Sequence, residues 1–195
     1  SDTNILSGAL EFSETLTSIG TQPIIGTQIL FKFKNFTGFI PLIAKNIIGY
    51  KNIVELSSKS YLNNSENSEP HCSFDDLLNK SSGIIVLSGS VRCLLGNLFN
   101  KGLFNEIEEI VSKLLISFKD DFYIEIQRHN DLNEKEFENF NLSISKKFNI
   151  PIIATHEVYY LDQNMFEAHD ALMCIGNKTY VNEKNRLKLS NKHYF

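Results

Sequence analysis

The strongest constraint on the fold is a regular alternation of short apolar runs with longer segments of helical spacing. Residues 83–89 and 151–155 are short, apolar and rich in β-branched side chains, as buried strands are. Residues 104–118 and 134–148 instead repeat apolar side chains every three or four positions. The alternation predicts an α/β fold with a mainly parallel sheet, either open or closed into a barrel.

The other expected elements follow the same alternation. Ser73 begins a short helix in which Asp76 completes a capping box, and Ile48, Val54 and Leu56 are the expected inward residues of a helix at 46–61. We expect further strands at 23–31, 39–44 and 122–127, further helices at 5–19, 91–99 and 164–175, helix ends at Gly20 and Gly176, and a surface loop at 63–71. Because neither a repeat nor a linker interrupts this pattern, we expect a single domain over residues 1–195.

Composition excludes several classes of protein. The 195 residues carry a net charge of −4, which argues against a basic nucleic-acid-binding face. With 42% hydrophobic residues, the chain has enough apolar material for a full core. Neither a membrane-spanning run nor a signal segment is visible, so we expect a cytoplasmic protein without membrane contact. Cys72, Cys93 and Cys174 are widely spaced, and we expect three reduced thiols rather than a disulfide or zinc site.

Candidate site residues are sought at the strand ends, because sites in parallel α/β folds form at the carboxyl ends of strands. Asp2 and Thr3, just before the first helix, belong to the same rim if a strand precedes them. The turn at 88–90 lacks the G-x-S-x-G frame of a nucleophile, which favours a plain turn. The candidates are Gln28, Ser88, Ser90, Gln127, Arg128, His129, Thr155, His156 and Glu157.

Some of these side chains are of the kind that holds a divalent ion, but their spacing matches no short metal motif. Two interpretations of these side chains therefore remain: that they bind a metal ion, or that they have a structural role. Glu125 alternates with apolar neighbours and faces either a polar interior or solvent. His129 can fix a loop through hydrogen bonds. Arg128 with Lys45 is a weak candidate for holding phosphate.

Seven motifs, in order along the chain, carry a family resemblance. They are GALEF at 8–12, PIIG at 23–26, LIAKN at 42–46, GYKN at 49–52, LSG at 87–89, DFYIEIQRH at 121–129 and EAHDAL at 167–172. The chain resembles the N-terminal PHP (polymerase and histidinol phosphatase) domain of the alpha subunit of bacterial DNA polymerase III. Residues 185–195 resemble the segment that leaves this domain toward the polymerase body.

The resemblance implies a distorted (β/α)7 barrel with a metal cluster at the strand ends. The family's first metal motif, H-x-H, would lie before Ser1, so we expect the first strand or strands of the barrel to be missing here. The family's second motif, T-D-H-G, reads Ser1-Asp2-Thr3-Asn4. Thr3 therefore stands where the family has a metal-binding His.

The remaining ligand positions depart from the family pattern in the same direction. Gln28 replaces a Glu, Phe39 a His and Ser90 a Cys, while the closing D-x-H reads Glu157-Val158-Tyr159. The resemblance thus predicts a degenerate metal site at Thr3, Gln28, Phe39, Ser90, Glu157 and Tyr159, with Asp2, Glu125, Arg128 and His129 as a residual rim. We expect the polar replacements to hydrogen-bond to one another and fill the cavity, and His156 to point away from Glu157.

The function implied by the resemblance is that of a structural module. The full-length protein would be a DNA-directed DNA polymerase using Mg²⁺, whereas this chain would hold neither catalytic residues nor a bound cofactor. Its expected partners are the rest of the polymerase chain and the proofreading exonuclease (epsilon) subunit, with DNA reached only indirectly. One alternative is an active PHP phosphoesterase or intrinsic 3′–5′ exonuclease using Zn²⁺ or Mn²⁺. Another, a free-standing histidinol phosphatase, is disfavoured by the motifs at 127–129 and 167–172.

Overall fold

A long antiparallel hairpin organises the sheet. Strand β2 (Gly26–Phe33) pairs with strand β3 (Phe36–Ala44) from Gly26 opposite Ile43 to Phe33 opposite Phe36. The two residues that join the strands include Lys34, whose φ of 54° makes the tight reversal possible. A two-residue connection can only join antiparallel neighbours, because a parallel pair needs a long crossover.

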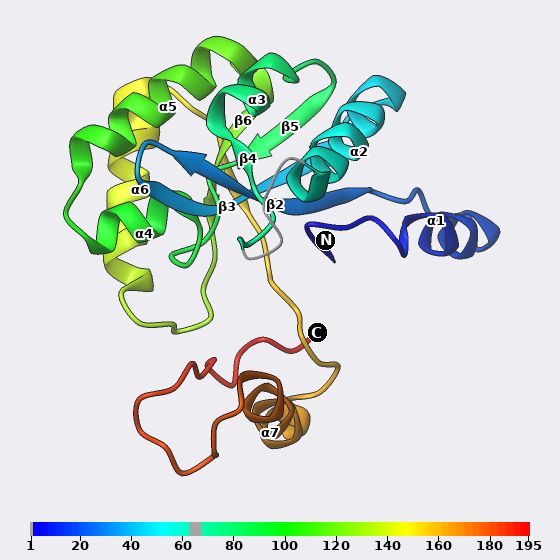
Figure 1. Cartoon of the computed structure of the whole chain (residues 1–195), viewed down its shortest axis with the longest axis vertical. Helices are drawn as coiled ribbons and strands as arrows, with labels where there is room; N and C mark the ends of the chain where they lie inside the picture. Colours follow the sequence, from blue (N-terminus) through cyan, green and yellow to red (C-terminus); the bar gives the residue numbers. More distant parts are fainter. Residues whose placement is uncertain (1, 63–67) are drawn as a thin grey trace.

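The computed structural model describes residues 2–62 and 68–195, and within them seven strands form one mixed sheet (Figure 1). The remaining strands are β1 (Asp2–Thr3), β4 (Cys72–Ser73), β5 (Ile84–Leu87), β6 (Phe122–Ile126) and β7 (Ile152–Ala154). Their order is β1-β2-β3-β5-β6-β7, with β4 beside β2. The expected α/β class is confirmed, but the sheet is mixed rather than mainly parallel around β3, which runs antiparallel to both β2 and β5.

The closed barrel stays a prediction. Within the described part of the chain, no pairing joins β7 to β1, so these strands are the two ends of an open sheet. Strand β7 pairs with β6 alone among described strands and is more exposed than expected for a buried strand, with Ile152 46% exposed. An end strand lacks one neighbour, which explains this exposure.

Seven helices are described, and all but the first and last cover the sheet where the sequence places amphipathic segments. They are α1 (Ala9–Ser18), α2 (Ile47–Leu62), α3 (Phe74–Asn79), α4 (Leu94–Asn100), α5 (Phe104–Phe118), α6 (Glu134–Phe148) and α7 (Phe166–Asn177). The bounds of α5 and α6 coincide with the predicted ones. The predicted capping box of α3 is present, since the Ser73 hydroxyl accepts from the Asp76 N–H at 3.1 Å and the Asp76 carboxylate accepts from the Ser73 N–H at 3.1 Å.

The core lies between the sheet and helices α2 to α6. Phe31, Leu42 and Phe122 from the strands are almost fully buried against Ile53 of α2 and Leu114 of α5. This packed core holds the strands in place, and it thereby determines the positions of the residues at their carboxyl ends.

Two predicted inward positions of α2 are wrong. Leu56 is buried, but Ile48 is 54% and Val54 37% exposed. The buried side of α2 instead carries Gly49, Ile53, Leu56 and Ser60, a stripe rotated from the expected one. The close contact of Gly49 with Gly83 sets this rotation, because a Cβ at Gly49 would lie 1.7 Å from the Gly83 carbonyl oxygen.

The first and last helices lie outside the main core (Figure 1). No residue of α1 is buried, although its apolar stripe predicted a packed helix, because α1 extends beyond the β1 end of the sheet. Gly20 follows α1 with φ of 78°, as expected of a helix end. Helix α7 runs one residue past Gly176, and Lys178 takes the left-handed conformation in its place.

The surface loop predicted at 63–71 lies partly outside the described residues. Among the helices that are described, none is both long enough and apolar enough to cross a membrane.

Candidate functional site

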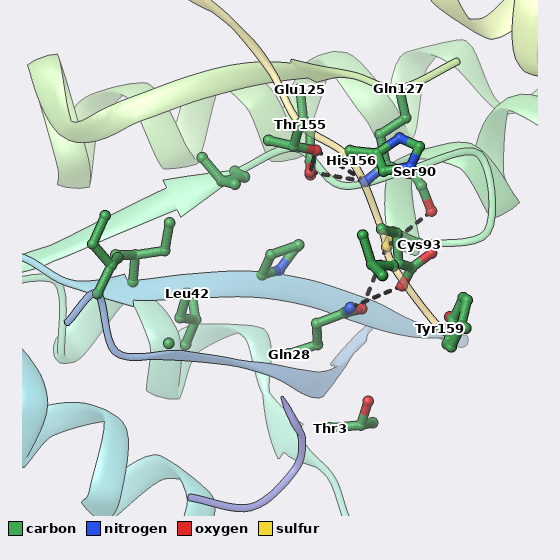
Figure 2. A pocket seen from close by; sticks show the side chains of 17 residues that line it. Thr3, Gln28, Leu42, Ser90, Cys93, Glu125, Gln127, Thr155, His156 and Tyr159 are labelled. Carbon is green, nitrogen blue, oxygen red and sulfur yellow. Dashed lines mark hydrogen bonds between the residues drawn. The ribbon is translucent and has the colours of Figure 1, made fainter. Parts of the chain in front are cut away.

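A cavity of about 420 Å³ lies where β5, β6 and β7 end, against one side of the β2–β3 hairpin (Figure 2). Residues from the three segments that follow β5, β6 and β7 line this cavity, as the sequence predicted. Gln28 also lines it, although it lies near the start of β2 and not after a strand. The predicted site residues that line the cavity are Thr3, Gln28, Ser90, Glu125, Gln127, Thr155, His156, Glu157 and Tyr159.

The turn after β5 positions one wall of the cavity. Ser88 is buried, and its hydroxyl accepts from the Glu125 N–H at 2.8 Å, which ties the end of β5 to β6. Gly89 has φ of 83°, and a Cβ there would lie 2.4 Å from the Cβ of Cys93. The structural reading of this turn is confirmed, because Ser88 is used as a buried hydrogen-bond acceptor.

Glu125 faces the polar interior rather than solvent. Its side chain is 5% exposed, and its Oε1 accepts from Gln127 Nε2 at 3.0 Å and from the Thr155 hydroxyl. Burial raises the pKa of Glu125 above its usual value, which favours the neutral carboxyl group. Glu125 Oε2 and Gln127 Oε1 are buried and have no hydrogen-bond partner among the described residues.

Glu157 is the second carboxyl group in the cavity, and it is paired with an arginine. Its Oε2 lies 2.8 Å from Nη2 of Arg92, and its Oε1 accepts from Gln28 Nε2 at 3.3 Å. The same Nη2 lies 3.4 Å from Oδ2 of Asp131. One guanidinium group thus contacts two carboxylates at the rim and offsets one of their two charges.

The polar replacements do not fill the cavity. In the described part of the chain, Gln28, Ser90 and Tyr159 form no hydrogen bond with one another. Gln28 and Ser90 instead contact Cys93, whose Sγ lies 3.9 Å from Gln28 Oε1 and 3.5 Å from Ser90 Oγ. Burial raises the pKa of Cys93 to about 11, so the thiol is neutral. Figure 2 shows Gln28 pointing at Cys93, with Thr3 apart from this group.

Three predicted positions lie elsewhere. Phe39 pairs with Leu30 farther along the hairpin, beyond the cavity wall. Asp2 lines a separate cavity of about 340 Å³ beside α1. Arg128 points outward and pairs with Glu138, with Nη2 to Oε1 at 2.7 Å.

The suggested phosphate pair is also wrong. Lys45 lies 2.7 Å from an oxygen of Asp121, while Arg128 pairs with Glu138. Each cation therefore has its own carboxylate partner, and the structure does not bring the two cations together.

His129 belongs to a buried cluster next to the cavity. Its Nε2 accepts from the Glu157 N–H at 3.1 Å, which assigns the ring proton to Nδ1. Glu134 Oε2 accepts from the N–H groups of His129 and Asn130, each at 2.7 Å. Burial lowers the pKa of His129, and the neighbouring His193 lowers it further. The loop-fixing reading of His129 is thereby confirmed.

The residues after β7 and those near the C-terminus meet in the same cluster. His193 is buried, with Nδ1 3.0 Å from the Glu157 carbonyl oxygen and Nε2 3.5 Å from Oδ1 of Asp131. His156 Nε2 lies 2.7 Å from the carbonyl oxygen of Tyr194. His156 and Glu157 both line the cavity, but their side chains have different partners, Tyr194 for His156 and Arg92 for Glu157.

His129, Asp131 and His193 place one ligand atom each within 4.8 Å of one another. The two imidazole rings are stacked, with planes 7° apart, so their nitrogen lone pairs run nearly parallel instead of converging on one point. Asp131 is also engaged by Arg92. The group therefore holds the C-terminal segment and is not preorganised for an ion.

Comparison with known proteins decides the family. A family model described as PHP domain matches residues 1–129. The chain belongs to the PHP domain family. Among curated proteins, it is 32% identical over 97% of its length to the DNA polymerase III subunit alpha of Caulobacter vibrioides. It is 34% identical over its whole length to that of Rickettsia prowazekii. It covers 17% of each of these relatives, so it spans about one sixth of their length.

A solved structure is also similar. It is a phosphoesterase from Bifidobacterium adolescentis described as metal-dependent, with 11% identity and a TM-score of 0.47 over 78% of this chain and 73% of that one.

At several of the positions that the resemblance assigns to metal ligands, this PHP domain carries other donor groups. Gln28 offers a neutral amide, Ser90 and Thr3 offer hydroxyls, and the Cys93 thiol is protonated. Such donors bind these ions weakly compared with carboxylates, imidazoles and thiolates. Arg92 adds a positive charge at the one carboxylate, that of Glu157, which the resemblance assigns to the ligand set.

Sequence reasoning missed several residues of the site. Arg92 and Cys93 lie just before α4, and their signal was their place directly after the β5 turn, within SVRC. Asp131 and His193 carried no local signal, because they are 62 positions apart and meet only in the folded chain.

Proposed function

We propose that this chain is the PHP domain of a DNA polymerase III alpha subunit and acts there as a structural module with a degenerate metal site. Similarity over nearly the whole chain to alpha subunits of several bacteria supports the polymerase context. The complete protein would then extend DNA primers with Mg²⁺, using catalytic carboxylates outside these 195 residues.

The observation that carries the proposal is the ion pair between Arg92 and Glu157, at 2.8 Å. Glu157 stands at the carboxylate position of the family's closing metal motif, and its charge is balanced by a side chain of the same protein. Burial also raises the pKa of Glu125, the other carboxyl group in the cavity. The Arg92 charge offsets part of the negative charge with which the cavity could attract a divalent ion.

As part of the same proposal, the domain docks the separate proofreading exonuclease (epsilon) subunit, the role that the resemblance implies for PHP domains with inactive sites. DNA is then contacted through partners, in keeping with the net charge of −4. Binding of the purified exonuclease subunit to the chain, followed by titration calorimetry, tests this step. Absence of binding to both this chain and the complete alpha subunit would remove the docking role.

The metal part is tested by measuring metal content. The complete alpha subunit is purified without chelators or a metal-binding tag and analysed by inductively coupled plasma mass spectrometry. We expect no tightly held zinc or manganese. One or more such ions per chain would overturn the degenerate-site proposal.

The alternative is a metal-dependent PHP phosphoesterase or intrinsic 3′–5′ exonuclease. One observation favours it: Glu125 Oε2 and Gln127 Oε1 are buried beside the cavity and have no hydrogen-bond partner within residues 2–62 and 68–195, and such oxygens are potential ligands. Release of nucleotides from a DNA 3′ end that depends on Mn²⁺ and is lost in Glu125→Gln would establish this alternative.

A further inference from the structure

Arg92 enters the rim from a position that the backbone fixes. It directly precedes Cys93, the N-cap of α4, and its N–H donates to the Ser90 hydroxyl at 3.3 Å. Its side chain is 30% exposed, and its Nη2 reaches carboxylates from two other parts of the chain. These are Glu157, after β7, and Asp131, between β6 and α6.

Both carboxylates are mostly buried and contact this cation. The side chains of Glu157 and Asp131 are 21% and 11% exposed. Burial alone would raise the pKa of Asp131, yet hydrogen bonding to His193 and the charge of Arg92 together lower it. Without the guanidinium group, two carboxylates would face one another across a poorly hydrated gap, which is unfavourable unless a cation enters.

We propose that Arg92 supplies, as a built-in side chain, the positive charge that a metal ion supplies in a metal-dependent cavity. Removing its guanidinium group then creates a divalent-cation site between Glu157 and Asp131. The inference rests on the proposed function, since it explains how the domain stays folded without an ion. Carboxylate oxygens that contact the same nitrogen atom are placed to share an ion at the usual distances of about 2.0–2.6 Å.

The experiment measures the thermal midpoint with and without millimolar MnCl₂, because Mn²⁺ favours oxygen ligands. The variants are Arg92→Met, which keeps the side-chain length without the charge, and Arg128→Met as the matched control. Arg128 also pairs with a glutamate, but at the surface and away from the cavity. We expect Arg92→Met to melt at least about 5 °C lower than the unmodified chain and to regain part of this loss with MnCl₂. The unmodified chain and Arg128→Met should show no response to MnCl₂.

A second variant keeps the inference falsifiable if Arg92→Met does not fold. Arg92→Met with Glu157→Gln removes one carboxylate together with the cation, and we expect it to fold, to melt above Arg92→Met and to ignore MnCl₂. If Arg92→Met melts like the unmodified chain, or is unaffected by MnCl₂, or if the double variant also fails to fold, the inference is wrong. A response of the unmodified chain to MnCl₂ would instead count against the proposed function.

Discussion

The ring of His193 stacks on the ring of His129, with centroids 4.0 Å apart and planes 7° apart. This contact joins the last residues of the chain to the loop that follows β6. The bridge between Tyr160 and Tyr194 and the bond from His156 to the Tyr194 carbonyl extend the same junction. The C-terminal segment is therefore held against the residues that follow β6 and β7.

Replacement of His193 by Ala should release this segment. The variant loses the stack and both polar contacts with Glu157 and Asp131. We expect faster cleavage by trypsin after Lys188 and Lys192, measured by mass spectrometry of the early fragments. The control is His71→Ala, which lies just before β4 and outside this cluster. It should be cleaved at the same rate as the unmodified chain. Equal cleavage rates in all three proteins would show that the stack does not anchor the segment.

Replacement of Glu125 by Gln should leave the domain as stable as before, or more stable, at neutral pH. Burial raises the pKa of Glu125 in the folded state, so folding favours the protonated form. The stability linked to this group is fully present below the ordinary glutamate pKa of about 4.3 and is lost as the pH rises through the folded-state pKa.

Thermal midpoints between pH 4 and pH 8 test this. The unmodified chain should lose more stability over that range than Glu125→Gln, whose amide still accepts at Oε1. A marked loss of stability in Glu125→Gln at pH 7 would mean that the anion itself is bound, for instance by a metal ion.

Asp170 should stabilise the C-terminal region at neutral pH and lose this effect in acid, whereas Glu125 contributes stability at low pH. Its two oxygens lie 2.6 and 2.7 Å from the guanidinium nitrogens of Arg186, and this bonding lowers the pKa of Asp170. Stability from a lowered carboxyl pKa is present above the ordinary value of about 3.9 and is lost as the pH falls through the folded-state value.

We therefore expect Asp170→Asn to increase hydrogen exchange in α7 at pH 6, with little difference from the unmodified chain near pH 2.5. Asp162→Asn, an exposed change just before α7, is the control. If exchange in α7 is the same in Asp170→Asn and the unmodified chain at pH 6, the ion pair does not hold this helix.

Two glycine replacements should have opposite effects on stability. A Cβ at Gly49 would lie 1.7 Å from the Gly83 carbonyl oxygen, so Gly49→Ala must push α2 away from the sheet, at a cost of about 3 kcal/mol. Gly176 has nothing within 4 Å of such a Cβ and lies in α7, so Gly176→Ala should stabilise by up to about 1 kcal/mol. Urea unfolding measures both, and a similar midpoint for the two variants would contradict the prediction.

Local pattern predicts the elements well where one side of a segment is buried in a continuous core. Helices α5 and α6 match their predicted bounds because their apolar stripes face the sheet throughout. Helix α1 shows the limit of this reasoning. Its apolar stripe predicts a packed helix, yet packing depends on what the rest of the chain brings to that side, and the described residues leave it exposed.

The candidate site was predictable in part for the same reason. Ser90, Gln127 and Glu157 follow strand ends, so the rule for parallel strands found them. The antiparallel β3 was not expected, and it places the cavity wall at Pro41 instead of Phe39. Arg92 was overlooked because its partners, Asp131 and Glu157, are far from it in sequence.

The β2–β3 hairpin also bears on the order in which the domain forms. Its two strands are separated by only two residues and lie early in the sequence. Strands β6 and β7 come much later, at Phe122–Ile126 and Ile152–Ala154, so they are synthesised after the hairpin is complete. Local contacts form faster than distant ones, and chains fold as they leave the ribosome. We therefore expect the β2–β3 hairpin, which carries Gln28, to form during synthesis before the rest of the cavity. Arg92, Asp131 and Glu157 complete the rim only when the later part of the chain has folded.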